Sequence, residues 1–130
     1  MTSTLRPARV EVDLDAVRDN VRSLADLVAP AAVVAVVKAD GYGHGSVPVA
    51  RAALEAGAVR LGVAIVQEGV RLREAGIDAP ILLLSEQPSS QLDAVVANRL
   101  IPTLYSIGAV RAMTDAVTRA GRSGYPVQIK

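Results

Sequence analysis

Short apolar segments alternate with amphipathic segments along the chain, and this alternation predicts strands connected by helices. The predicted strands are residues 10–12, 32–37, 61–64, 81–84, 101–104 and 127–130. The predicted helices are residues 14–28, 46–57, 67–75, 90–97 and 106–120. Strand and helix follow one another in this way in βαβ units, whose parallel strands are joined by right-handed crossovers.

Polar residues and glycines mark the predicted helix ends. The predicted N-caps are Asp13, Ser46, Ser106 and Ser90, the last forming a capping box with Asp93. The first helix ends before Pro30, and glycines close the second, third and last helices at residues 57, 76 and 121.

Two α/β architectures are compatible with this pattern, an open doubly wound sheet and part of a (β/α)8 barrel. No GxGxxG follows the first buried strand, which weakens the dinucleotide-binding form of the open sheet. A TIM-type barrel needs eight strands and about 250 residues, so residues 1–130 would supply its N-terminal part with roughly five strands. Because Lys130 falls within a predicted strand, we expect the chain to be the N-terminal portion of a longer protein.

Composition narrows the functional classes. Hydrophobic residues make up 51% and charged residues 21%, which is typical of a folded domain and excludes disorder. The formal net charge of +1 gives no electrostatic reason to expect nucleic-acid or membrane binding. With no cysteine and one histidine, no metal site is expected. Residues 1–7 lack the apolar region of a signal peptide, and no apolar run is long enough to span a bilayer, so we expect a cytoplasmic location.

The main candidate for chemistry is Lys38, directly after the apolar run 32–37. Desolvating a charged amine is costly, whereas a neutral amine can attack a carbonyl and form a Schiff base. Three glycines at alternating positions, residues 41, 43 and 45, allow the backbone to turn sharply beside a ligand. The alternative is a strand-end lysine that faces solvent, since lysine is rarely buried.

Two further residues of this loop are candidates. The hydroxyl of Tyr42 can donate to an anionic group such as a cofactor phosphate, or it can simply remain hydrated at the edge of a half-buried ring. His44, between two glycines, is more often a structural hydrogen-bonding residue than a base, and we favour that interpretation.

Residues 36–45, VVKADGYGHG, resemble the pyridoxal-phosphate (PLP) attachment motif of the bacterial alanine racemases. The similarity covers essentially the whole chain. Residues 11–17 with Asn20 resemble the opening strand and helix of the family, and residues 52–58 and 72–77 resemble its next two helix ends. The family implies an N-terminal (β/α)8 barrel, a C-terminal β-rich domain that is absent from this chain, and a homodimer whose active sites are shared between subunits.

The resemblance also implies a role for each matching residue. Lys38 would form the Schiff base with PLP and exchange the α-proton on the D-amino acid side. Tyr42 would contact the cofactor phosphate, and Leu84 would lie beside the cofactor ring. Lys130 falls where many members of the family have a lysine carbamylated by CO2, although it could equally be an ordinary strand-end lysine.

The implied reaction is the interconversion of L- and D-alanine by two bases, which supplies D-alanine for the cell wall. A racemase needs a second acid/base on the opposite face of the substrate. In the family this is a tyrosine from the C-terminal domain of the partner subunit, and neither Tyr105 nor Tyr125 matches its motif. We therefore expect residues 1–130 alone to be inactive.

Three alternatives stay open at the level of the sequence. The first is a PLP-dependent decarboxylase or aldolase of the same fold, against which the continuous YGHG after the lysine argues. The second is a non-catalytic PLP-binding carrier barrel. The third is a scaffold barrel in which Lys38 is exposed.

Overall fold

The computed structural model describes residues 8–130 and contains two sets of parallel strands. The larger sheet has the order β1-β2-β3-β4, and a smaller one pairs β5 with β6. The strands are β1 (Val34–Val36), β2 (Arg60–Val63), β3 (Ile81–Leu83), β4 (Leu100–Ile101), β5 (Thr103–Leu104) and β6 (Gln128–Ile129). Because the strands follow chain order and are joined by helices, the predicted α/β class and partial barrel are confirmed.

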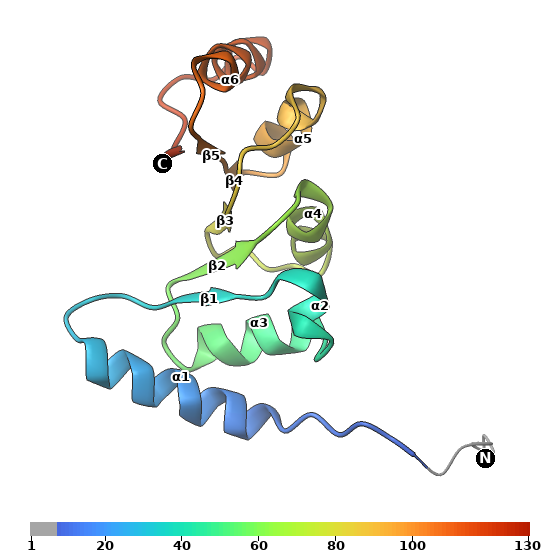
Figure 1. The fold of residues 1–130 in the computed structure, drawn as a ribbon, viewed down its shortest axis with the longest axis vertical. Helices are drawn as coiled ribbons and strands as arrows, with labels where there is room; N and C mark the ends of the chain where they lie inside the picture. Colours follow the sequence, from blue (N-terminus) through green and yellow to red (C-terminus); the bar gives the residue numbers. More distant parts are fainter. Residues whose placement is uncertain (1–7) are drawn as a thin grey trace.

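The helices form the second layer of the domain. They are α1 (Leu14–Val28), α2 (Lys38–Tyr42), α3 (Ser46–Glu55), α4 (Val66–Glu74), α5 (Leu92–Ala97) and α6 (Ile107–Arg119), with a 3-10 turn η1 (Ser89–Gln91) before α5. Figure 1 shows β1 to β5 following one another along the long axis of the molecule, with α1 beside α3 at one end and α6 at the other.

The core lies between the sheet and the helices. Apolar side chains from alternate strand positions pack there against apolar residues of α4, α5 and α6, as the pleat of a strand requires. Fully buried members include Leu61, Leu72, Ile81, Leu83 and Val95. On the opposite face of β1, Val34 and Val36 are 40% and 37% exposed. Residues 32–37 were predicted as a buried strand, but only Val34–Val36 form β1, and its outer face is partly exposed because β1 is an edge strand in the part of the chain that the structure describes.

Two of the predicted helix caps are confirmed and two are wrong. Asp13 accepts hydrogen bonds from the backbone of α1, and Ser106 accepts one from Ala109 at 3.1 Å. Ser46 is not a cap but the first residue of α3, and its N–H donates to Asp40 Oδ1 at 3.0 Å. Ser90 lies inside η1 and forms no capping box. The residue at the cap position of α5 is Gln91, and its side chain makes no cap hydrogen bond.

Two predicted strands also differ from the structure. Residues 10–12 form no strand, since no other described segment pairs with this exposed stretch. The segment 101–104 is divided by Pro102, which has no N–H to donate to a ladder. Its carbonyl accepts from Gln128 N at 2.9 Å instead, so that β4 belongs to one sheet and β5 to the other.

Gly69 marks the closest approach of α4 to the sheet. A Cβ at this position would lie 2.8 and 2.9 Å from the two methyl carbons of Leu100, a side chain with no exposed surface in which to move. We expect Gly69→Ala to lower the free energy of unfolding by about 1 kcal/mol, because overpacking outweighs the gain in helix propensity. Gly108→Ala, where a Cβ meets only Ser106 Oγ at 4.0 Å, should instead raise it by roughly 0.5 kcal/mol. Urea unfolding of both variants checks the pair, and equal stabilisation by the two substitutions would contradict the packing argument.

Candidate active site

Lys38 lies at the carboxyl end of β1. The parallel pairing continues past the strand, since Val37 N donates to Gly62 O at 2.9 Å. Val37 is fully buried on the helix side, and side chains alternate along a strand, so Lys38 belongs to the same face as Val36. Lys38 is half-buried there. This is the predicted position, and it is the end of the strands at which barrel enzymes carry their catalytic groups.

The chain after Lys38 makes a left-handed turn. The φ angles of Ala39, Asp40, Gly41 and Tyr42 are 52°, 53°, 64° and 57°, so α2 is not an ordinary right-handed helix. Each non-glycine residue in this conformation costs about 1–2 kcal/mol. The glycines of the motif predicted a sharp turn, but they did not indicate that Ala39 and Asp40 would be part of the strain. Strain of this kind persists only where surrounding contacts hold it, and it clusters at ligand sites.

Asp40 is one of the residues that hold the turn. Its carboxylate accepts from Ser46 N at 3.0 Å and lies 3.3 Å from an Arg71 nitrogen, while its carbonyl accepts from Gly45 N at 2.8 Å. The hydrogen bond from Ser46 and, after it, the charge of Arg71 hold the pKa of Asp40 below its usual range. The same hydrogen bond fixes the start of α3 relative to the lysine loop.

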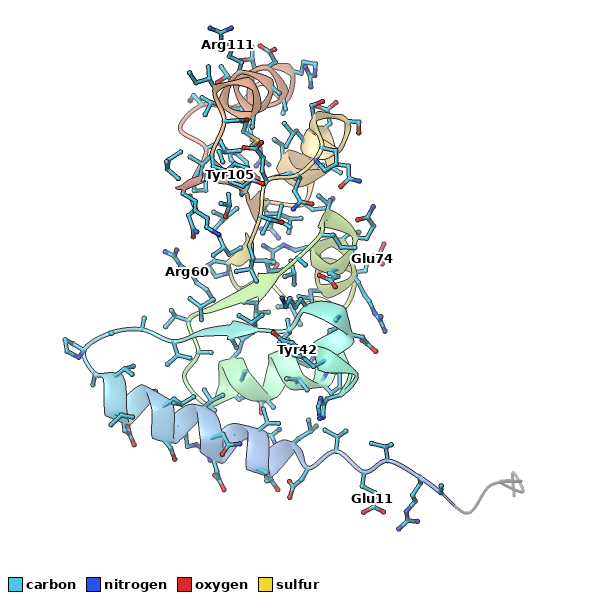
Figure 2. All side chains as sticks on the ribbon, in the orientation of Figure 1. Glu11, Tyr42, Arg60, Glu74, Tyr105 and Arg111 are labelled. Atoms are coloured by element: carbon cyan, nitrogen blue, oxygen red, sulfur yellow. The ribbon has the colours of Figure 1, made fainter. Side chains whose placement is uncertain are left out.

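The two other candidates of this loop lie at its surface. Tyr42 is 59% exposed and stands beside the turn at the end of β1, where it is labelled in Figure 2. His44 Nδ1 lies 3.0 Å from Gly41 O. A ring nitrogen that donates to a backbone carbonyl in this way stabilises the loop, which agrees with the structural role favoured from the sequence.

Leu84 follows β3 and extends the pairing with β2, since its N–H donates to Val63 O at 2.9 Å. A Cβ placed on Gly62 would lie 3.3 Å from Leu84 Cδ2 and 3.4 Å from Val36 Cγ2. The bare backbone of Gly62 is thus flanked by two aliphatic side chains on the face of Lys38. Val36, Gly62 and Leu84 together form what we call the apolar floor of the site.

Lys130 lies apart from the other candidates. It follows β6 and is exposed, with its N–H donating to Leu104 O at 3.1 Å. Because all pairings are parallel, Lys130 is also at the carboxyl end of its strand, but β2, β3 and β4 lie between β1 and this second sheet (Figure 1). The structure places Lys38 and Tyr42 in one turn and Leu84 on the sheet face of Lys38, and it does not bring Lys130 to them. The site roles assigned to all four residues stay predictions.

Three polar side chains that the sequence analysis missed connect the ends of successive strands. Glu68 accepts from Ala39 N at 2.7 Å and Ala64 N at 2.8 Å, which joins the end of β1 to that of β2. Gln87 Nε2 donates to Ala64 O at 3.0 Å and so joins the loop after β3 to β2. Glu86 accepts from Tyr105 N at 2.8 Å and from Ser106 N and Oγ, which joins the same loop to the end of β5. The hydrogen bond from Tyr105 N, aided by those from Ser106, lowers the pKa of Glu86.

These features define a barrel-type α/β domain with a lysine-centred candidate active site at the carboxyl ends of its strands. The family model described as alanine racemase, N-terminal domain, matches residues 12–130. The chain belongs to this family, as the resemblance of its lysine motif implied.

Individual relatives agree with this assignment. Alanine racemase 1 of Oceanobacillus iheyensis is 50% identical over 115 residues, which cover 88% of this chain and 31% of that protein. Alanine racemase of Symbiobacterium thermophilum is 49% identical over 118 residues, covering 91% and 31%. The crystal structure of alanine racemase from D-cycloserine-producing Streptomyces lavendulae superimposes with a TM-score of 0.85 at 40% identity, covering 95% of this chain and 32% of that one. The chain thus spans about a third of the length of the relatives it matches. Among residues 8–130, no helix is long and apolar enough to cross a membrane.

Proposed function

We propose that residues 1–130 are the N-terminal part of the PLP-binding barrel of an alanine racemase, an isomerase that interconverts L- and D-alanine. The observation that carries this proposal is the placement of Lys38. It lies at the carboxyl end of β1, next to a strained left-handed turn, in a chain up to half identical to proteins named alanine racemase.

The residues present fit the chemistry of PLP. Lys38 would hold the cofactor covalently, because its amine is the one group of the lysine loop that can bond to an aldehyde. Tyr42 offers a hydroxyl beside three glycines for the phosphate, and the apolar floor of Val36, Gly62 and Leu84 suits one face of an aromatic ring. When bound, PLP acts as an electron sink that makes the α-proton of an amino acid removable. Lys38 Nζ is the atom of this chain that would take up and return that proton.

The proposal extends to the assembly. The second base would be a tyrosine of the partner subunit in a homodimer, since neither Tyr105 nor Tyr125 lies in the loop that holds Lys38. Lys130, exposed at the end of β6, would be carbamylated and orient groups supplied by the rest of the barrel. The enzyme would act in the cytoplasm, where its D-alanine is available for the cell wall.

Borohydride trapping tests the lysine assignment. Full-length protein saturated with PLP is reduced and digested, and the modified peptide is identified by mass spectrometry. We expect one cofactor adduct, on Lys38, and none on Lys130, the second of the two lysines in this chain. An unmodified Lys38 would exclude both the racemase and the carrier alternatives. An adduct on Lys38 without conversion of L- to D-alanine would retain the cofactor and reject the racemase.

A further inference from the structure

The carboxylate of Glu68 is shared between the ends of two neighbouring strands. Glu68 lies in the first turn of α4 and accepts three backbone hydrogen bonds, from Ala39 N at 2.7 Å, Ala64 N at 2.8 Å and Ile65 N at 3.3 Å. Among the described residues it forms no ion pair with an arginine or lysine. Both carboxylate oxygens are therefore used to hold backbone rather than to neutralise a cation.

The three hydrogen bonds of Glu68 differ in length and in the segment that they reach. A glutamate at the third position of a helix commonly reaches back to the N–H of the capping residue, which here is Ile65. That contact is the longest of the three, and the shortest crosses to Ala39, 29 residues earlier in the chain. Short bonds to a charged acceptor are the stronger ones. Glu68 Oε1 thus holds the lysine loop, while its other oxygen holds the segment that leads from β2 into α4 through Ala64 and Ile65.

The backbone of Ala39 determines the orientation of the peptide plane that follows Lys38. The carbonyl of Lys38 and the N–H of Ala39 belong to one planar peptide unit, so fixing this N–H fixes the plane that leads out of the lysine. Ala39 also begins the left-handed turn, with φ 52° and ψ 48°. An alanine does not hold this conformation by itself, because its Cβ disfavours it. The hydrogen bond that Ala39 N donates to Glu68 supplies the constraint from outside the loop.

A second contact from the same helix acts on the next residue. Arg71 follows Glu68 by three positions, so both side chains leave the same face of α4. Arg71 lies 3.3 Å from the carboxylate of Asp40. One face of α4 therefore holds two consecutive residues of the turn, Ala39 and Asp40, directly after the lysine.

We propose that Glu68 is a positioning residue for Lys38. By holding the N–H of Ala39 it fixes the backbone plane from which the lysine side chain extends, and so confines Nζ to the region above the apolar floor. The proposal rests on the proposed function, in which Nζ must meet an aldehyde carbon. It concerns a residue that touches neither cofactor nor substrate and acts through the backbone.

The test uses the cofactor-free full-length protein and three variants. Glu68→Gln keeps the shape but loses one acceptor oxygen, and Glu68→Asp keeps the charge but is too short to reach Ala39. Glu74→Gln is the matched control, since Glu74 is exposed on the same helix and is labelled in Figure 2. Four quantities are compared: the rate at which added PLP reacts with Lys38, the melting temperature without cofactor, and kcat and KM for alanine after the protein has been loaded with PLP.

We expect both Glu68 variants to slow the reaction of Lys38 with PLP by about tenfold or more and to lower kcat similarly, while KM changes less than about twofold. The Glu74 variant should behave as the wild type. Glu68→Asp keeps the protein folded even if the glutamine variant is unstable, because aspartate is well tolerated in the first turn of a helix. A lower melting temperature with wild-type reaction rates would show a structural role only and overturn the proposal. If the wild type itself gives no adduct at Lys38, the proposed function fails and this proposal fails with it.

Discussion

In the racemase that we propose, replacing Lys38 with arginine should lower kcat for alanine racemisation by the full-length protein by at least about 10³-fold. A guanidinium stays protonated at any pH the protein survives, so it can neither attack an aldehyde nor exchange a proton with substrate. It does preserve the charge and much of the length of the side chain, which separates a chemical role of Lys38 from a merely electrostatic one. The measurement is the rate of D-alanine formation from L-alanine at saturating cofactor.

The control for this experiment is Arg111→Lys, an exchange of the same two residue types at an exposed position of α6, remote from β1 in Figure 2. It should leave kcat within about twofold of the wild type, as is usual for surface substitutions away from a site. Retention of a tenth or more of the activity by the Lys38→Arg variant would show that the amine is not essential.

The second large effect concerns stability. Arg73 on α4 donates to four backbone carbonyls: Nε to Asn98 O at 2.9 Å, Nη1 to Ile77 O at 2.6 Å and Ala79 O at 2.8 Å, and Nη2 to Arg99 O at 3.0 Å. Partial burial, followed by the nearby charge of Arg99, lowers the pKa of the guanidinium from its ordinary value. We expect Arg73→Met to reduce the free energy of unfolding by about 3 kcal/mol, because several carbonyls lose a charged donor at once.

A matched substitution isolates this effect. Arg119→Met removes an arginine from α6 whose ion pair with Asp93, at 2.7 Å, is largely exposed, so the expected loss is less than about 1 kcal/mol. Urea unfolding of the two variants gives the comparison. Equal losses would mean that the four carbonyl contacts contribute no more than an ordinary surface ion pair.

Much of the layered fold could be predicted from the periodicity of apolar residues and from the residues that mark helix ends. Asp13 and Ser106 were identified as caps because a cap is a local arrangement, decided by residues two or three positions apart. Ser46 was misassigned because the acceptor for its N–H is Asp40, which a non-local turn brings into place. The division of segment 101–104 at Pro102 depended on which neighbouring strand was available on each side, and that is decided by tertiary packing.

In the candidate site, too, local features could be predicted from the sequence and contacts between distant residues could not. Lys38 and Tyr42 belong to one continuous motif and could be recognised from it. Glu68 contacts the loop from 29 residues away, and no local pattern connects it with Ala39. A glutamate at the third position of a helix was a visible signal, but it predicts only a helix cap.

The two ends of the parallel strands, here called the two rims of the sheet, are held by different side chains. Glu68, Glu86 and Gln87 interlock the loops on the rim that carries the lysine, whereas Arg73 gathers the segments that enter β3 and β4 on the opposite rim. The side chains that we expect to contribute most to stability are therefore different from those that shape the candidate site. Substitutions around Arg73 can therefore change the stability of the domain while the geometry around Lys38 is left unchanged.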